Sequence, residues 1–137
     1  MTDLSSLARS LVVPGKGILA ADESEGTADE KRLAAFGIET GPEMRRKFRD
    51  LLLATPGIEE YLSGVILYKE TLSQKDTSDG IPSKDVDGLP FSELLARRTI
   101  IPGIKVDEGL EPLSEGSKET ITKGLLGLPE RLTEYHA

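Results

Sequence analysis

The sequence predicts an α/β fold in which short parallel strands alternate with helices. Apolar runs near residues 18–22, 64–68 and 100–106 are short and lack polar alternation, which is typical of strands that are buried on both faces. Helical spacing and helix start or stop signals lie between these runs. Three parallel strands alone leave two open sheet edges, so the pattern indicates the opening portion of a larger domain.

The segment before the first strand is predicted to be a leading helix. Leu4, Leu7 and Leu11 recur at helical spacing, and Asp3 is suited to cap the helix start. Pro14 is expected to end this element, since proline cannot continue a helix.

Two further helices are predicted between the first and second strands. Thr27 and Glu30 have the spacing of a capping box, in which each side chain satisfies a free backbone amide, and Gly37 is a suitable stop. A second helix is expected to begin at Pro42 and to end before Pro56.

After the second strand, turn-forming residues predict a long exposed loop near residues 74–90, which contains two copies of an Asp-Gly-X-Pro pattern. A helix is predicted at 91–98, before the third strand. Pro102 lies inside that strand and removes one backbone donor, so a bulge or an irregular start is expected there. Pro129 suits the first turn of a last helix.

Composition excludes several classes of protein. With 24 acidic and 17 basic residues the formal net charge is -7, which argues against a nucleic-acid or membrane-surface partner. The chain has no cysteine, so neither a disulfide framework nor a thiolate metal site is available. The amino terminus lacks the features of a signal peptide, and no apolar run reaches membrane-spanning length. We therefore expect a cytoplasmic protein.

Reactive side chains in α/β proteins lie where buried parallel strands reach their carboxyl ends. Asp22 follows the first predicted strand, and Lys105 and Asp107 lie at the end of the third. Lys105 and Asp107 are two residues apart, so on a strand they would share one face, where they could also be a structural ion pair.

Four segments together resemble class I fructose-bisphosphate aldolase, in the order and spacing of that family. They are PGKGILAADES at residues 14–24, LSGVILYKETL at 62–72, IIPGIKVDEG at 100–109 and TITKGL at 120–125. The resemblance implies a TIM (β/α)₈ barrel, of which this chain would supply the first three or so βα units. It also implies reversible cleavage of fructose 1,6-bisphosphate, a sugar phosphate, into dihydroxyacetone phosphate and glyceraldehyde 3-phosphate. That reaction proceeds through a lysine Schiff base, without a metal or another cofactor. A homo-oligomer is expected for the full-length protein.

The resemblance also implies roles for individual residues. Asp22 matches the catalytic aspartate that follows strand one, and Lys105 matches an active-site lysine of strand three. Ser24 and Thr27 fall in a loop associated with a substrate phosphate. Arg32, or its neighbour Lys31, would contact the other end of the substrate.

The chain departs from the family in three respects. The Schiff-base lysine lies on a later strand, so residues 1–137 alone are expected to be inactive, and a non-catalytic truncated product that is unstable or docks onto an intact aldolase is the alternative. Between Ser24 and Arg32 the chain carries one residue more, which in a regular α-helix would rotate the following residues by about 100°. Thr99 stands where the family commonly has glycine, and a strained glycine position would disfavour threonine.

Overall fold

The computed structural model describes residues 3–77 and 88–136. One partial barrel domain over residues 1–137 stays a prediction; the structure divides into two compact units, Met1–Ile104 and Lys105–Ala137. No side chain is buried in the described part of the second unit.

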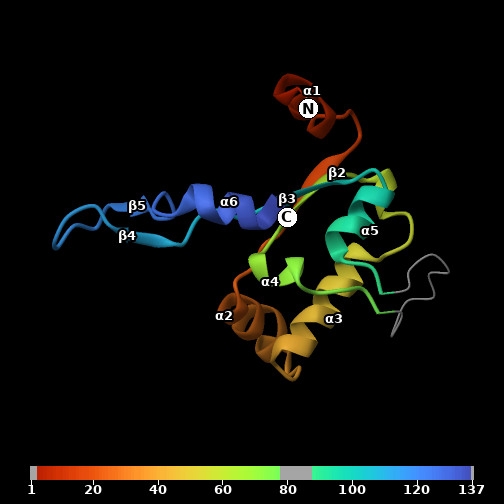
Figure 1. The fold of residues 1–137 in the computed structure, drawn as a ribbon. Coiled ribbons are helices and arrows are strands. Elements are labelled where there is room, and N and C mark those ends of the chain that lie inside the picture. The colour runs from red at the N-terminus through yellow and green to blue at the C-terminus, as the bar shows by residue number, and fades with distance from the viewer. Residues whose placement is uncertain (1–2, 78–87, 137) are drawn as a thin grey trace. The chain divides into compact units, whose positions relative to one another are not determined.

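The first unit contains a three-stranded parallel sheet, which confirms the predicted α/β class (Figure 1). Its strands are β1 (Gly17–Ala21), β2 (Leu62–Leu67) and β3 (Ile101–Ile104), in the order β1-β2-β3. Each overlaps a predicted strand but ends one or two residues earlier. Asp22 and Lys105 therefore lie just after their strands and not within them.

The bulge expected at Pro102 is absent, because β2 and β3 keep one register through the pair Val65 and Pro102. In this sheet β3 is an edge strand, which needs backbone hydrogen bonds on one side only and so tolerates proline. The register shift lies elsewhere, between Gly17 and Ile18 of β1.

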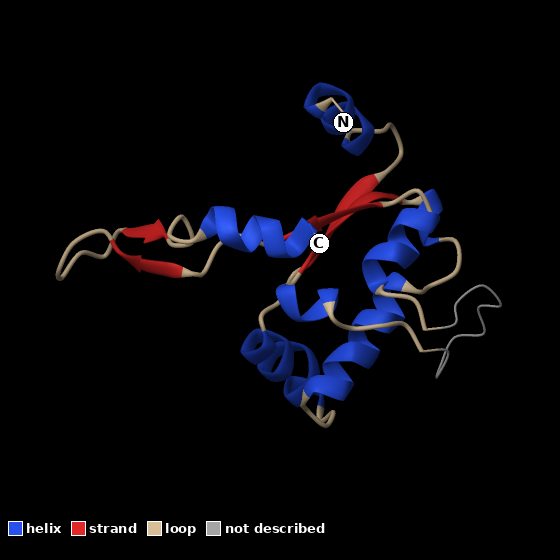
Figure 2. Cartoon of the chain, in the orientation of Figure 1, coloured by secondary structure: helices blue, strands red, loops and turns tan. Residues whose placement is uncertain are grey.

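Helices α3 and α5 lie on one side of this sheet (Figure 2). The helical elements of the first unit are α1 (Leu4–Leu11), α2 (Glu25–Ala28), the π-helical turn η1 (Asp29–Leu33), the 3₁₀ turns η2 (Ala34–Phe36) and η3 (Ile58–Glu60), α3 (Pro42–Leu53), α4 (Lys69–Leu72) and α5 (Phe91–Arg97). The cap predicted for the leading helix is present, since both carboxylate oxygens of Asp3 accept backbone N–H bonds. Helix α1 also lies against β2, where an added Cβ at Gly64 would be 2.7 Å from a methyl carbon of Leu11.

The predicted capping box at Thr27 is wrong. The N-cap residue is Ser24, three residues earlier, and the helix begins at Glu25, so Thr27 lies inside α2. The predicted stop at Gly37 is confirmed by its left-handed backbone, with φ of 70°.

The π-helical turn η1 overlaps the segment, between Ser24 and Arg32, where the sequence has one residue more than the family pattern. Hydrogen bonds from i to i+5 give a π turn room for one residue more than an α-helical turn. The turn can thus take up an extra residue locally, without the rotation of all later residues that a regular α-helix would require.

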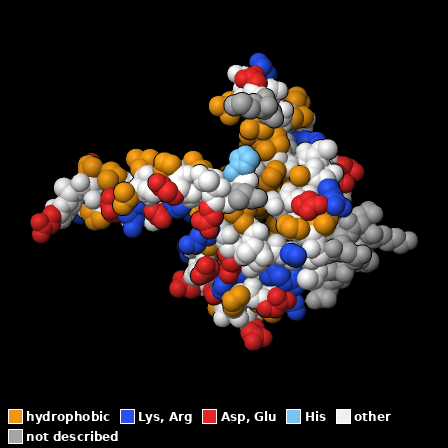
Figure 3. Space-filling view, in the orientation of Figure 1, with side chains coloured by type: hydrophobic (Ala, Val, Ile, Leu, Met, Phe, Trp, Pro, Cys, Tyr) orange, Lys and Arg blue, Asp and Glu red, His pale blue; other side chains and the backbone are white. Residues whose placement is uncertain are grey.

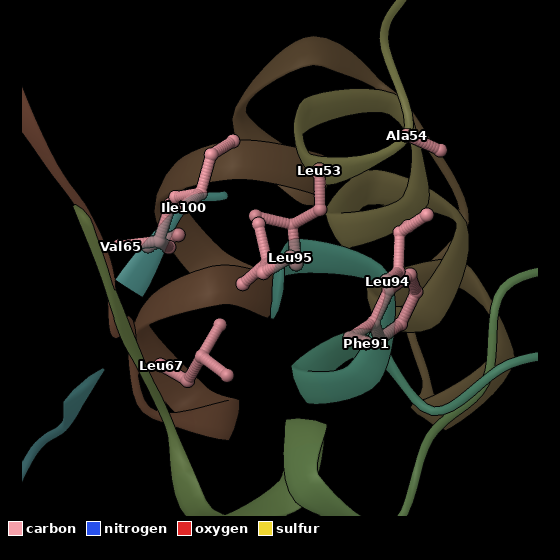
Figure 4. Close-up of a cluster of buried hydrophobic side chains, with 9 residues drawn as sticks. Leu53, Ala54, Val65, Leu67, Phe91, Leu94, Leu95 and Ile100 are labelled. Atoms are coloured by element: carbon pink, nitrogen blue, oxygen red, sulfur yellow. The ribbon is translucent and has the colours of Figure 1, made fainter. Parts of the chain in front are cut away.

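The core of the first unit lies between the sheet and helices α3 and α5 (Figure 4). Val65 and Leu67 of β2 are two residues apart and point to the same face. The cluster consists of Ala21, Leu53, Ala54, Val65, Leu67, Phe91, Leu94, Leu95 and Ile100, all at most 3 % exposed. Burying each of its large side chains contributes about 1.5–3 kcal/mol.

Thr99 has φ of 58°, and no other non-glycine residue in the described ranges has a positive φ. This confirms the strained glycine position expected from the sequence. The strain lies between α5 and β3, where the chain must turn back into the sheet.

The predicted loop at 74–90 is structured at its base. Lys75 pairs with Pro90 in an antiparallel bridge, and the Asp76 N–H donates to the Leu89 carbonyl at 2.9 Å. Asp76 is only 2 % exposed, so this part of the predicted exposed loop is buried. The first Asp-Gly-X-Pro copy, at 79–82, and Asp87 of the second copy lie outside the described residues.

The second unit contains a hairpin and a helix: β4 (Leu110–Pro112) pairs with β5 (Thr120–Thr122), and α6 spans Leu128–His136. Pro129 lies in the first turn of α6, as predicted. We did not predict the hairpin. No helix in the described part of the chain has the length and apolar character needed to cross a membrane.

Candidate functional site

The carboxyl ends of β1 and β2 lie next to each other, because Ala21 pairs with Leu67. Asp22 therefore follows β1 at the same sheet edge at which Tyr68 follows β2. Asp22 is half-buried. The structure thus places it at the position where α/β enzymes carry reactive side chains.

Ser24 and Thr27 are brought together. The Ser24 hydroxyl donates a hydrogen bond of 3.0 Å to the Thr27 hydroxyl oxygen, and both side chains are half-buried. Since Ser24 is the N-cap residue and Thr27 lies one helical turn later, α2 presents two hydroxyls side by side.

Arg32 lies close to the same segment. Its Nε donates to Glu23 Oε1 at 2.8 Å, which holds the guanidinium beside the residue that separates Asp22 from Ser24. The Arg32 side chain remains 53 % exposed, so most of this cation is open to solvent. Lys31 is also exposed.

Lys105 forms an ion pair with Asp107 in the second unit. Both residues lie beyond the end of β3, so the prediction that they share a strand face is wrong, whereas the alternative of an ion pair is confirmed. The hydrogen bond from Lys105 and a second one from the Gly109 N–H lower the pKa of Asp107.

The sequence analysis missed a buried network of charged residues on helix α3. Arg49 Nη1 donates to Glu70 Oε2 at 2.6 Å, and Arg45 Nη2 donates to Glu70 Oε1 at 2.7 Å. Arg45 Nη1 also donates to Asp29 Oδ2 at 2.7 Å, and Arg49 Nη2 donates to the Glu23 carbonyl at 3.1 Å. The network therefore reaches the segment that carries Ser24 and Thr27.

Charges within this network stabilise one another. Burial alone would raise the pKa of Glu70, but hydrogen bonds from Arg45 and Arg49 outweigh burial and lower it. The hydrogen bond to Glu70 raises the pKa of Arg45 above its ordinary value. A signal for the network was present in the sequence, since arginines at positions 45 and 49 share one face of a predicted helix.

A second cluster lies along α3 and ends in a pair of carboxyl groups. Arg46 binds the carboxylate of Glu43 and, at 3.4 Å, that of Asp50. Burial and a hydrogen bond with the Asp50 carboxyl raise the pKa of Asp76 to about 7. Two carboxyl groups can share such a bond only when one of them holds a proton.

Figure 3 shows acidic and basic side chains interspersed over the α2 and α3 end of the first unit. Among residues 3–77 and 88–136, no group of three or more His, Cys, Asp or Glu side chains is arranged to hold a metal ion. The described part of this site therefore offers hydroxyls, a carboxylate and guanidinium groups as its chemical groups.

Comparisons with known proteins give a consistent result. Residues 3–137 match the family described as fructose-bisphosphate aldolase class-I. A probable fructose-bisphosphate aldolase class 1 of Xanthomonas axonopodis is 47 % identical over 133 residues, and fructose-bisphosphate aldolase 1 of Toxoplasma gondii is 47 % identical over 134 residues. These alignments cover 97 % and 98 % of this chain, but 37 % and 34 % of the relatives.

A solved structure agrees with these sequence matches. Fructose-bisphosphate aldolase of Plasmodium falciparum, crystallised in complex with TRAP and a small-molecule inhibitor, superposes with a TM-score of 0.84 at 44 % identity. The superposition covers 97 % of this chain and 35 % of the Plasmodium chain. The sequence thus spans about a third of the length of the proteins that it matches.

Proposed function

Because this chain belongs to the class I fructose-bisphosphate aldolase family, we propose that it is the N-terminal part of an enzyme that cleaves fructose 1,6-bisphosphate reversibly. The products would be dihydroxyacetone phosphate and glyceraldehyde 3-phosphate, in glycolysis. The observation that carries the proposal is the position of Asp22, directly after β1, with Ser24 two residues later and its hydroxyl bonded to that of Thr27. The match over about a third of each relative favours this reading over a non-catalytic truncated product.

The proposed reaction requires a lysine that forms a Schiff base, which the resemblance places on a later strand outside residues 1–137. A protonated imine withdraws electrons from the adjacent carbon, so the bond between the two halves of the sugar can break and leave an enamine. Within this chain, the Asp22 carboxylate would orient intermediates and move protons near the imine. Lys105, which is paired with Asp107, would anchor a phosphate or lower the pKa of a neighbouring group.

The substrate contacts proposed for this chain lie on α2 and η1. Hydroxyls are donors suited to phosphate oxygens, and the adjacent hydroxyls of Ser24 and Thr27 would bind one phosphate group together. The exposed guanidinium of Arg32 would contact the other end of the substrate, as a planar donor that fits phosphate geometry.

The same proposal extends to fold and assembly. The three βα units would be the first part of a TIM (β/α)₈ barrel, in which the open edges of β1 and β3 pair with further strands. The complete protein would be a cytoplasmic homo-oligomer. One Arabidopsis thaliana relative, 46 % identical, is named as cytosolic and another, 43 % identical, as chloroplastic, so the compartment varies among relatives.

A chimera tests this function. Residues 1–137 would replace the matching N-terminal third of the Xanthomonas enzyme, and cleavage of fructose 1,6-bisphosphate would be measured. We expect an active chimera in which Asp22→Asn lowers kcat by about 10²–10⁴-fold, the usual size of an acid–base contribution. A folded chimera without activity, or one that Asp22→Asn leaves fully active, would contradict the proposal. The 137-residue chain alone should form no borohydride-trapped adduct with dihydroxyacetone phosphate.

A further inference from the structure

We propose that two buried arginines of α3, Arg45 and Arg49, are positioning residues for the segment of residues 23–29. That segment follows Asp22 and carries the Ser24 and Thr27 hydroxyls. The consequence for catalysis rests on the proposed aldolase function, whereas the structural role of the arginines does not depend on it.

Arg49 holds the beginning of the segment. Its guanidinium is 2 % exposed and donates through Nη2 to the Glu23 carbonyl oxygen at 3.1 Å. The same group donates through Nη1 to Glu70 at 2.6 Å and lies 6.0 Å from the centre of the Tyr68 ring. Residues of two chain segments, the one after β1 and the one after β2, therefore fix this guanidinium, and it in turn fixes the backbone next to Asp22.

Arg45 holds the end of the segment. Its Nη1 donates to Asp29 Oδ2 at 2.7 Å, and the other oxygen of Asp29 accepts the Gly41 N–H at 3.3 Å. Its Nε and Nη2 bind the carboxylate of Glu70 in a bidentate arrangement. Bidentate pairs of this kind define orientation as well as distance.

Glu70 joins the two arginines into one unit. It lies in α4, which begins two residues after β2 ends, and it accepts hydrogen bonds from both guanidinium groups. Arg45 and Arg49 are one helical turn apart on α3. The arrangement thus ties the chain after β1 to the chain after β2, at the sheet edge where Asp22 lies.

Stability alone gives a weak reason for such a network. Replacing a buried ion pair by well-packed apolar residues is often neutral or stabilising, because apolar groups avoid the cost of removing charges from water. A network that forms hydrogen bonds with both ends of one short segment instead fixes the position of that segment's backbone. The segment held here, residues 23–29, contains the two hydroxyls proposed to bind a phosphate.

Arg46 supplies a matched comparison on the same helix. It is also buried, but its hydrogen bonds with the described residues go to Glu43, Asp50 and the Lys75 carbonyl, and not to residues 23–29. Loss of Arg46 removes a buried guanidinium from α3 but leaves the hydrogen bonds of Arg45 and Arg49 with residues 23–29 intact.

The test uses the chimera described above, with variants Arg49→Met, Arg49→Lys and Glu70→Gln, and with Arg46→Met as control. Amide hydrogen exchange of residues 23–29 and the steady-state constants kcat and KM are measured for each variant. We expect Arg49→Met to speed exchange in this segment by about tenfold or more, because the segment loses a charge-assisted hydrogen bond. We also expect kcat/KM for fructose 1,6-bisphosphate to fall on the order of a hundredfold, as for a misplaced reacting group.

The control and the conservative variant separate positioning from stability. Arg46→Met should lower the unfolding temperature while leaving exchange in residues 23–29 unchanged, and Arg49→Lys should recover part of kcat/KM. The proposal is overturned if Arg49→Met leaves exchange in the segment unchanged, or if Arg46→Met loosens the segment equally. Should Arg49→Met not fold, Arg49→Lys and Glu70→Gln give the same readout. An inactive parent chimera would refute the proposed function, while the exchange measurement would still decide the role of the arginines.

Discussion

Helix α3 carries two clusters of buried charged residues, which differ in how well positive groups are matched by negative ones. On one side Arg45 and Arg49 meet the carboxylates of Glu70 and Asp29, so positive and negative groups match. On the other side the cluster of Arg46 ends at two carboxyl groups, of which Asp76 has its pKa raised to about 7. Both clusters contain arginines of the same helix. Yet the carboxylate of Glu70 is expected to stay ionised at neutral pH, whereas the Asp76 carboxyl is expected to titrate there.

The difference comes from the partners and not from the arginines. In the first cluster each carboxylate oxygen of Glu70 accepts a hydrogen bond from a guanidinium, which favours the ionised form. In the second cluster no N–H group of the described residues donates to Asp50 Oδ1 or Asp76 Oδ2, so the bond between the two carboxyls needs a proton on one of them, and burial disfavours a second negative charge. One cluster therefore suits a fixed geometry, and the other suits a response to pH.

The largest effect is expected for Glu70→Gln, which breaks the first cluster. The substitution leaves Arg45 and Arg49 buried without their shared carboxylate, and removing one partner of a buried pair typically costs about 3–5 kcal/mol. Denaturant unfolding of the chimera measures this loss. The control is Glu43→Gln, since the Glu43 side chain is 65 % exposed and its loss should cost less than about 1 kcal/mol. Equal effects of the two substitutions would contradict the distinction between a buried pair and a surface pair.

The next effect is the pH dependence of the second cluster. Because the pKa of Asp76 is raised from 3.8 to about 7 on folding, its stabilising contribution is complete below pH 4 and is lost as the pH rises to about 7. We expect the free energy of unfolding to fall by roughly 2–4 kcal/mol over this range. Glu70 has the opposite sign, since its lowered pKa makes its contribution disappear as the solution becomes acidic.

Asp76→Asn isolates this dependence. The asparagine amide can donate to Asp50 at any pH, so the decrease between pH 4 and pH 7 should flatten and the variant should be more stable than the parent above pH 7. Unfolding by denaturant at a series of pH values measures both expectations. A parent profile that is already flat across this range would show that Asp50 and Asp76 do not share a proton.

Much of the first unit could be predicted because its signals are local. Three short apolar runs located the parallel strands, and the positions of Asp22 and Lys105 followed from where those runs stop. Thr99 was identified as strained because one backbone position demanded glycine, and its φ of 58° bears this out.

The features that sequence reasoning missed depend on distant contacts or on very short elements. The strands β4 and β5 have three residues each, too few to show a period of two. The cluster around Glu70 unites residues from η1, α3 and α4 whose pairing no periodicity reveals. The start of α2 was misplaced because Thr27 and Glu30 fit a capping box, although Ser24 three residues earlier is the N-cap.

A smaller effect is expected where α3 ends. Arg98 donates to the carbonyl oxygens of Leu53, Ala54 and Thr55, and the strained residue Thr99 comes directly after it. Thr99→Gly should raise the free energy of unfolding by about 1 kcal/mol, since glycine adopts positive φ without the steric cost that a side chain brings. Thr99→Ala is the matched control, because alanine keeps the strain and should give no such gain. Unfolding of the two variants at neutral pH compares them directly.

The smallest effect should come from an arginine that lies outside both clusters. Arg97 pairs with Glu93 at 2.6 Å on α5, but the two side chains are 60 % and 47 % exposed. Water already solvates both charges, so Arg97→Ala should change the free energy of unfolding by no more than about 0.5 kcal/mol. Its ion-pair distance equals that of Arg49 with Glu70, so the two arginines differ in burial and not in contact length. A loss for Arg97→Ala as large as that for Glu70→Gln would show that distance, and not burial, governs the charged clusters of this protein.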